Sequence, residues 1–177
     1  MTESNKCSNQ KRIKHKHIEG IQEETDVTLQ KGNEASYVIY VEEQRYQFIQ
    51  GKESDKITFK GTLPKGVTEV YMEIKQDKNK KPEQLIKELE SNLKQKYQEV
   101  NGVGEVKEPI NALRIIRKMG NKWNSSIEKI YVISNQQQGS FVITQHYFLE
   151  AEEGHGARFD EMLKEFHIVD QKKGDPS

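Results

Sequence analysis

Residues 127–149 read IEKIYVISNQQQGSFVITQHYFL, and this stretch decides the fold. Its first part, Ile127–Ser134, is rich in β-branched and aromatic residues, a composition typical of a strand. Asn135–Gly139 is a polar turn, so the strand after it is expected to form a hairpin with the first. That second strand, Ser140–Leu149, carries apolar side chains on both faces. It is therefore predicted to lie in the centre of a sheet, covered on both sides.

Further strands are predicted upstream of this hairpin, at 36–41, 46–49, 56–63, 67–75 and 112–119. Apolar and polar residues alternate in Lys56–Leu63, which indicates a strand with one buried and one solvated face. The segment 46–49 follows 36–41 after the polar link Glu42–Gln44, so we expect these two strands to form a hairpin.

Two segments have the apolar spacing of amphipathic helices. In 82–98, Pro82 suits a first helical turn, and apolar residues recur at Leu85, Ile86, Leu89, Leu93 and Tyr97. A shorter helix is predicted from Phe159, Met162, Leu163 and Phe166. Strands joined by short turns are antiparallel. The sequence thus predicts one α+β domain over 35–170, with helices packed on an antiparallel β-sheet.

Both ends of the chain have compositions typical of disorder. Residues 1–34 contain only seven hydrophobic residues, with a net charge of +4 over 1–17 and −4 over 18–34. So little apolar surface does not offset the entropy lost on ordering. We expect residues 1–34 to form a disordered polar tail or tether, and residues 171–177 to form a second disordered tail.

The C-terminal part, ending in EAEEGHGARFDEMLKEFHI (150–168), resembles the PsbP-like superfamily, which includes bacterial lipoproteins of the DcrB and LpqN type. The matching positions are Tyr147, Arg158, Phe159, Met162, Leu163, Phe166 and Ile168. The helix segment PEQLIKELESNLKQKY (82–97) is also similar, and the resemblance covers 36–169. It implies a PsbP-like α/β/α sandwich and a non-enzymatic role in binding or assembly. The chain departs from the family pattern at 63–66, where no Trp follows the Pro-Lys-Gly turn.

Composition excludes several classes of protein. The 28 basic and 28 acidic residues balance, whereas a nucleic-acid binder is expected to be clearly basic. The longest uninterrupted apolar stretches span only a few residues, too few for a membrane-spanning helix. Cys7 is the only cysteine, so neither an intrachain disulfide nor a cysteine-based zinc site is expected. We expect no nucleic-acid partner and no cofactor.

The best candidate for a partner-binding surface is the polar loop Gly120–Ser126. It carries Trp123, the only tryptophan, and Trp is enriched among the residues that dominate binding energies at interfaces. Lys122 and Arg117 would make this surface basic. The alternative is a tryptophan folded back over the edge of the sheet.

The histidines are weaker candidates. His15 and His17 lie among lysines that repel a cation, so we expect no metal site there. His146 and His155 would be the residues of interest in a small-ligand binder or hydrolase with a cleft between sheet and helix. No Ser-His-Asp or Cys-His motif accompanies them, so we expect no enzyme.

The function expected from the sequence is a non-catalytic binding or assembly module. It would be the soluble, monomeric domain of a bacterial envelope lipoprotein, held outside the membrane by a lipid on Cys7. The residues before Cys7 lack the small, apolar character of a lipoprotein cleavage site. The alternative is therefore a cytoplasmic adaptor that binds a protein partner, and the second alternative is the small-ligand binder or hydrolase.

Overall fold

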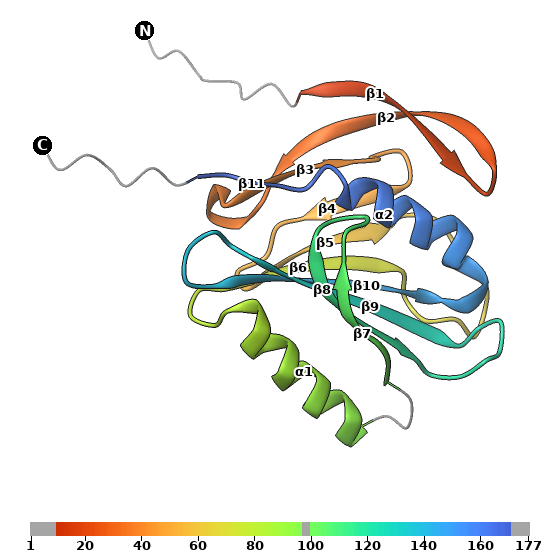
Figure 1. The fold of residues 1–177 in the computed structure, drawn as a ribbon. Helices are drawn as coiled ribbons and strands as arrows, with labels where there is room; N and C mark the ends of the chain where they lie inside the picture. The colour runs from red at the N-terminus through yellow and green to blue at the C-terminus, as the bar shows by residue number, and fades with distance from the viewer. Residues whose placement is uncertain (1–9, 97–99, 171–177) are drawn as a thin grey trace, which may run out of the picture.

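The computed structural model describes residues 10–96 and 100–170, which form two antiparallel β-sheets and two α-helices (Figure 1). The smaller sheet has the order β1-β2-β3-β11. Its strands are β1 (Lys11–Ile18), β2 (Ile21–Lys31), β3 (Tyr37–Val41) and β11 (His167–Ile168). This arrangement confirms the predicted α+β class.

The larger sheet has seven strands in the order β4-β5-β6-β10-β9-β8-β7. The strands are β4 (Tyr46–Ile49), β5 (Ser54–Phe59), β6 (Tyr71–Asp77), β7 (Val100–Val106), β8 (Ala112–Lys118), β9 (Ser126–Ser134) and β10 (Ser140–Phe148). As predicted, β9 and β10 form a hairpin, with Ile143 opposite Tyr131, and β10 occupies the centre of the sheet.

The two faces of the large sheet are covered by different elements, because β10 alternates between two apolar cores. Phe141, Ile143 and Tyr147 belong to the main core, whereas Val142 packs on the opposite side. Helix α1 (Pro82–Lys96) covers that opposite side. Its residues Leu85, Ile86 and Leu93 pack against Ile115, Ile130 and Val132. Within the described residues, neither helix is long and apolar enough to cross a bilayer.

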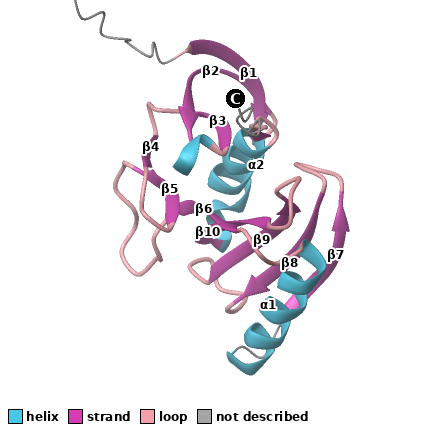
Figure 2. Cartoon of the chain, turned by 90° about the vertical axis from the view of Figure 1, so that its left-hand side faces the viewer, coloured by secondary structure: helices cyan, strands magenta, loops and turns pink. Residues whose placement is uncertain are grey.

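The main core lies between the large sheet and the layer formed by the small sheet and α2 (Ala157–Leu163), which Figure 2 shows from the side. The ring of Tyr37 on β3 stacks on Phe166 at 4.9 Å and meets Phe141 of β10 edge-on at 5.7 Å. Phe159 of α2 packs against Tyr46 of β4. Aromatic contacts of this kind join the two sheets and α2 into one core.

The structure corrects the predicted hairpin between 36–41 and 46–49. Strand β3 pairs with β2, and β4 pairs with β5, so the chain passes from one sheet to the other at this point. A turn makes the crossing, with the amides of Arg45 and Tyr46 donating to the carbonyl of Glu42. The Glu42 side chain is buried and forms an ion pair with Lys16. Local sequence patterns do not encode this contact.

The structure also differs from the disorder expected over 1–34, because residues 11–31 form the hairpin β1–β2. Charge compensates for the scarcity of apolar residues. On the inner face of β1, Arg12 pairs with Glu165 at 2.8 Å, and Lys14 donates to the carbonyl of Glu161 at 2.9 Å. Residues 1–9, which include Cys7, and residues 171–177 lie outside the described part of the chain.

Strand β7 is a further element that the sequence did not predict. The expected end of the helix at 101–104 is instead part of a strand that pairs with β8, with a register irregularity between Asn101 and Gly104. Helix α1 is described over Pro82–Lys96, and the last two positions of the predicted helix, 97–98, lie outside the described residues. Glycines are poor strand formers, so the pattern around this irregularity resembles a loop.

The central position of β10 predicts a large effect of truncation there. Ile143→Ala should lower the free energy of unfolding by about 2–5 kcal/mol, because the fully buried side chain leaves a cavity. Ile13→Ala is the matched control, since this side chain on β1 is 63% exposed and its removal should change stability little. Urea denaturation of the two variants measures the difference, and equal losses would contradict the core assignment.

Candidate functional site

The loop of residues 119–125 between β8 and β9, called the Trp123 loop below, presents two large apolar side chains to solvent. Trp123 is 48% exposed and Met119 is 53% exposed. The indole packs against the ring of Phe148 in a T-shaped arrangement, with 6.4 Å between the ring centroids. This contact covers only part of the Trp123 side chain. Lys122 is exposed beside it.

Hydrogen bonds fix the backbone of the Trp123 loop. The amide of Glu150 donates to the carbonyl of Trp123 at 3.0 Å, and the amide of Leu149 donates to the carbonyl of Ser125 at 2.8 Å. Ser125 and Lys122 close a tight turn through two further bonds. The Asn124 side chain reaches the carbonyl of Gly66 in the neighbouring loop at 3.3 Å. The loop is therefore held by its own turn and by two other segments of the chain.

Arg117 lies apart from this exposed surface. It is on β8, only 8% exposed, and its guanidinium pairs with Glu128 of β9 at 2.6 Å. The cross-strand register places Arg117 opposite Glu128, Glu128 opposite His146, and His146 opposite Tyr71. These four side chains form a polar row on the face of the sheet that α1 also covers. Of the two basic residues expected beside Trp123, Lys122 is exposed on the loop and Arg117 is buried.

His146 is held in this row by neighbours on every side. Its ring stacks on Tyr71 at 4.9 Å. Its Nδ1 lies 2.7 Å from the carbonyl of Glu69 and carries the proton, because a carbonyl only accepts. Its Nε2 lies 3.4 Å from the hydroxyl of Thr68 and 3.9 Å from Glu128. This geometry is that of a satisfied structural histidine.

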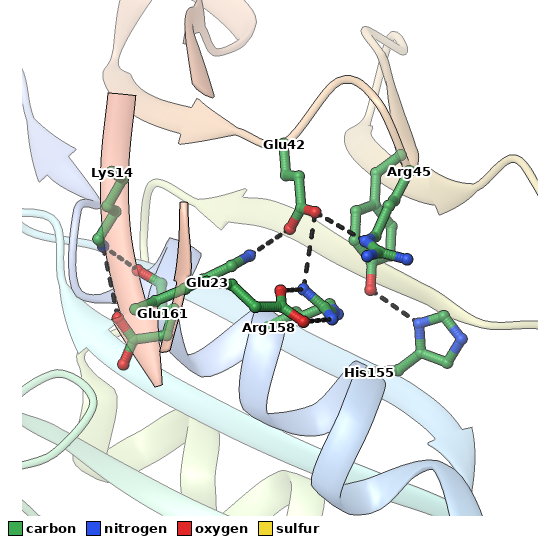
Figure 3. A network of polar contacts seen from close by, with 9 residues as sticks. Lys14, Glu23, Glu42, Arg45, His155, Arg158 and Glu161 are labelled. Carbon is green, nitrogen blue, oxygen red and sulfur yellow. Dashed lines mark hydrogen bonds and ion pairs between the residues drawn. The ribbon is translucent and has the colours of Figure 1, made fainter. Parts of the chain in front are cut away.

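His155 belongs to a second polar cluster, in the π-helical turn Glu152–Gly156 that precedes α2 (Figure 3). The Tyr46 hydroxyl lies 2.7 Å from Nδ1 of His155. Burial, together with the guanidinium groups of Arg158 and Arg45, lowers the pKa of His155 to about 4. Burial also raises the pKa of Tyr46. At neutral pH the hydroxyl therefore donates to an uncharged imidazole.

Glu42 and Arg158 form the centre of the same cluster (Figure 3). Arg158 of α2 binds Glu23 of β2 through two hydrogen bonds of 2.7 and 3.0 Å. Glu42 is only 2% exposed and accepts from both Lys16 and Arg45. The Arg158 guanidinium lies 3.6 Å from Glu42. Four separate segments thus meet around one buried carboxylate, an arrangement that locks the hairpin β1–β2 onto α2.

Sequence patterns indicate only part of this cluster. The family resemblance includes Arg158, and His155 is a candidate histidine, but the sequence pattern predicts Glu42 to lie in a polar link. The spacing of Arg12, Lys14 and Lys16 on alternate positions is the one local feature consistent with a strand whose basic face is covered.

Neither metal nor nucleophile chemistry is suggested by these groups. His15 and His17 are exposed on the outer face of β1, and His15 lies 3.5 Å from Glu24. Over 10–96 and 100–170, no group of three His, Cys, Asp or Glu side chains is placed to hold a metal ion. Three surface hollows lined by described residues, with volumes of about 390, 120 and 460 Å³, have neither His146 nor His155 in their walls.

Comparison of the chain with models of protein families, with curated proteins and with solved structures finds no match. The contacts described above are therefore the basis for the functional inference.

The depressed pKa of His155 predicts a loss of stability in mild acid. The unfolded chain takes up a proton near pH 6.5 and the folded chain only near pH 4, so stability falls as the pH drops between these values. The loss should be about 2–3 kcal/mol. Urea midpoints measured from pH 7 to pH 4 test this, and His155→Phe should remove most of the slope. An unchanged slope in that variant would contradict the assignment.

The cluster around Glu42 predicts unequal roles for its two arginines. Arg158→Met should destabilise the protein by about 3–5 kcal/mol, because it removes both hydrogen bonds to Glu23 and one of the three cations around the buried carboxylate of Glu42. Arg45→Met is the matched control and should change stability by less than about 1 kcal/mol, since Arg45 is half exposed. Thermal or urea unfolding compares the two, and equal effects would show that burial does not govern the cluster.

Proposed function

We propose that this protein is a non-catalytic binding or assembly module that contacts a partner protein through the Trp123 loop. The observation that carries the proposal is the pair of exposed apolar side chains, Trp123 and Met119, on a loop that hydrogen bonds hold to residues 149–150 and to Gly66. Trp is among the residues most often found at interface hot spots.

A fixed loop favours binding because little conformational entropy remains to be lost on association. The indole already rests against Phe148, so a partner would cover its exposed half without rearranging the sheet. Lys122 beside the indole and the half-buried Lys118 supply a basic rim. Such a surface suits a partner with an apolar pocket bordered by acidic side chains.

The non-catalytic part of the proposal is supported by the state of the two histidines. His146 is bonded to a backbone carbonyl and stacked on Tyr71, and His155 accepts from Tyr46. Both imidazoles thus have internal structural partners. The alternative of a small-ligand binder or hydrolase with a cleft at these histidines is less favoured, because neither ring lines any of the three hollows described above.

Membership of the PsbP-like superfamily remains our proposal for the family. What supports this proposal, and the α/β/α sandwich that goes with it, is that α1 packs on one face of the large sheet while α2, together with the small sheet, packs on the other. We likewise propose a monomer held outside a bacterial membrane by a lipid on Cys7. A cytoplasmic adaptor using the same loop is the alternative, and the two differ only in compartment.

Crosslinking in the native cells tests the binding surface. A photoreactive amino acid at position 122 should give a specific adduct with a partner, and Trp123→Ala should abolish that adduct. The same amino acid at Lys87 is the control, because Lys87 is exposed on α1, away from the Trp123 loop. Adducts of equal yield from both positions, or an adduct that survives Trp123→Ala, would contradict the proposal.

The intact mass of the protein from fractionated native cells tests the compartment. A lipid-modified N-terminus at Cys7 in the membrane fraction is the expected result. A protein that retains Met1 and is recovered in the cytosol would replace the envelope proposal with the adaptor.

A further inference from the structure

A cavity of about 390 Å³ lies between the two sheets, at the end of β10 opposite the Trp123 loop. The start of β3, the start of β5, the end of β6 and the start of β10 surround it. Its size is within the range of about 300–1,000 Å³ found for small-ligand pockets. The walls of the cavity contain no residue of the Trp123 loop, so the two features are distinct in position.

The floor of the cavity contains a buried carboxylate. Asp55 is 1% exposed and accepts hydrogen bonds from the Tyr37 hydroxyl at 2.6 Å, the Asn33 amide at 2.8 Å and the Gly51 amide at 3.2 Å. All three donors are neutral. A carboxylate has about four accepting positions, so one remains. The three donors stabilise the buried carboxylate, and a cation at the remaining position would stabilise it further.

The rim of the cavity carries the opposite charge. Lys52, Lys75 and Lys78 border it and are exposed. Lys78 already pairs with Glu34 at 2.6 Å, so Lys52 and Lys75 are the better candidates to bind an anionic group. The ionisable residues of the wall are balanced, with three lysines against Glu34, Glu53 and Asp55.

The backbone at the rim is strained. Glu34 and Ala35 have φ values of 55° and 51°, a left-handed conformation that is uncommon outside glycine. This turn places the amide of Asn33 on Asp55 and Glu34 at the edge of the cavity. Strain of this kind is concentrated at functional sites.

We propose that this cavity binds a small zwitterion, with a primary ammonium group directed to Asp55 and a carboxylate or phosphate group held by Lys52 and Lys75. The apolar sides of Tyr37, Ile74 and Phe141 line the space between the two charges. A cation alone would meet the lysine rim, and an anion alone would meet the acidic floor. Only a molecule that carries both charges satisfies the two ends.

Titration of the full chain, followed by amide NMR, tests the proposal with a zwitterion and its two halves. The probes are 4-aminobutanoate, butylamine and butanoate, together with O-phosphoethanolamine. A zwitterion should shift the amides of 33–37, 51–55 and 74–76, with an affinity about tenfold above that of either half. Preference for O-phosphoethanolamine would identify a phosphate headgroup, and preference for 4-aminobutanoate would identify a free amino acid.

Two variants locate the charges. Lys52→Ala with Lys75→Ala should weaken zwitterion binding about three- to tenfold without changing the melting temperature, because both side chains are exposed. Lys87→Ala is the control and should bind as the parent does. Asp55→Asn, if folded, should lose the preference for the ammonium group. Equal binding of the zwitterion and its halves, or no shift of these amides by either zwitterion at millimolar concentration, would overturn the proposal.

Discussion

The structure depends on one constraint, which is that strand β10 is apolar on both faces and must be covered on both. The small sheet and α2 cover one face of β10. Helix α1 covers the other face, which carries Val142. A strand of this kind is stable only in the interior of a sheet. The remaining strands of the large sheet are then arranged on its two sides, and the two proposed binding sites lie where β10 begins and ends.

A second interaction, the burial of Glu42, fixes the position of the N-terminal hairpin. Its carboxylate forms ion pairs with Lys16 of β1, Arg158 of α2 and Arg45 in the turn after β3. A shift of β1 by one residue would turn Lys16 to solvent and His17 to Glu42, because side chains alternate along a strand. Buried ion pairs add little net stability, but here they specify one register.

Apolar periodicity was sufficient to predict the β9–β10 hairpin, the central position of β10 and helix α1, because those elements carry their pattern locally. It did not predict β1–β2, whose partners Glu161 and Glu165 lie more than a hundred residues later, nor β7, where glycines interrupt the pattern. The binding role of the Trp123 loop, inferred from one rare residue, stays a prediction. The burial of the Asp55 carboxylate could not be predicted from the sequence, because β3 and β5 together create its environment.

The pairing of β1 and β2 with α2 has a consequence for the time at which the chain can fold. Arg158 and Glu23 are 135 positions apart, and Lys14 and Glu161 are 147 apart. A ribosome releases the hairpin long before α2, so the hairpin's cations have no acidic partners on α2 until that helix has been synthesised. The first strands therefore acquire their final place only when α2 has emerged, which makes the appearance of this helix the step that closes the domain.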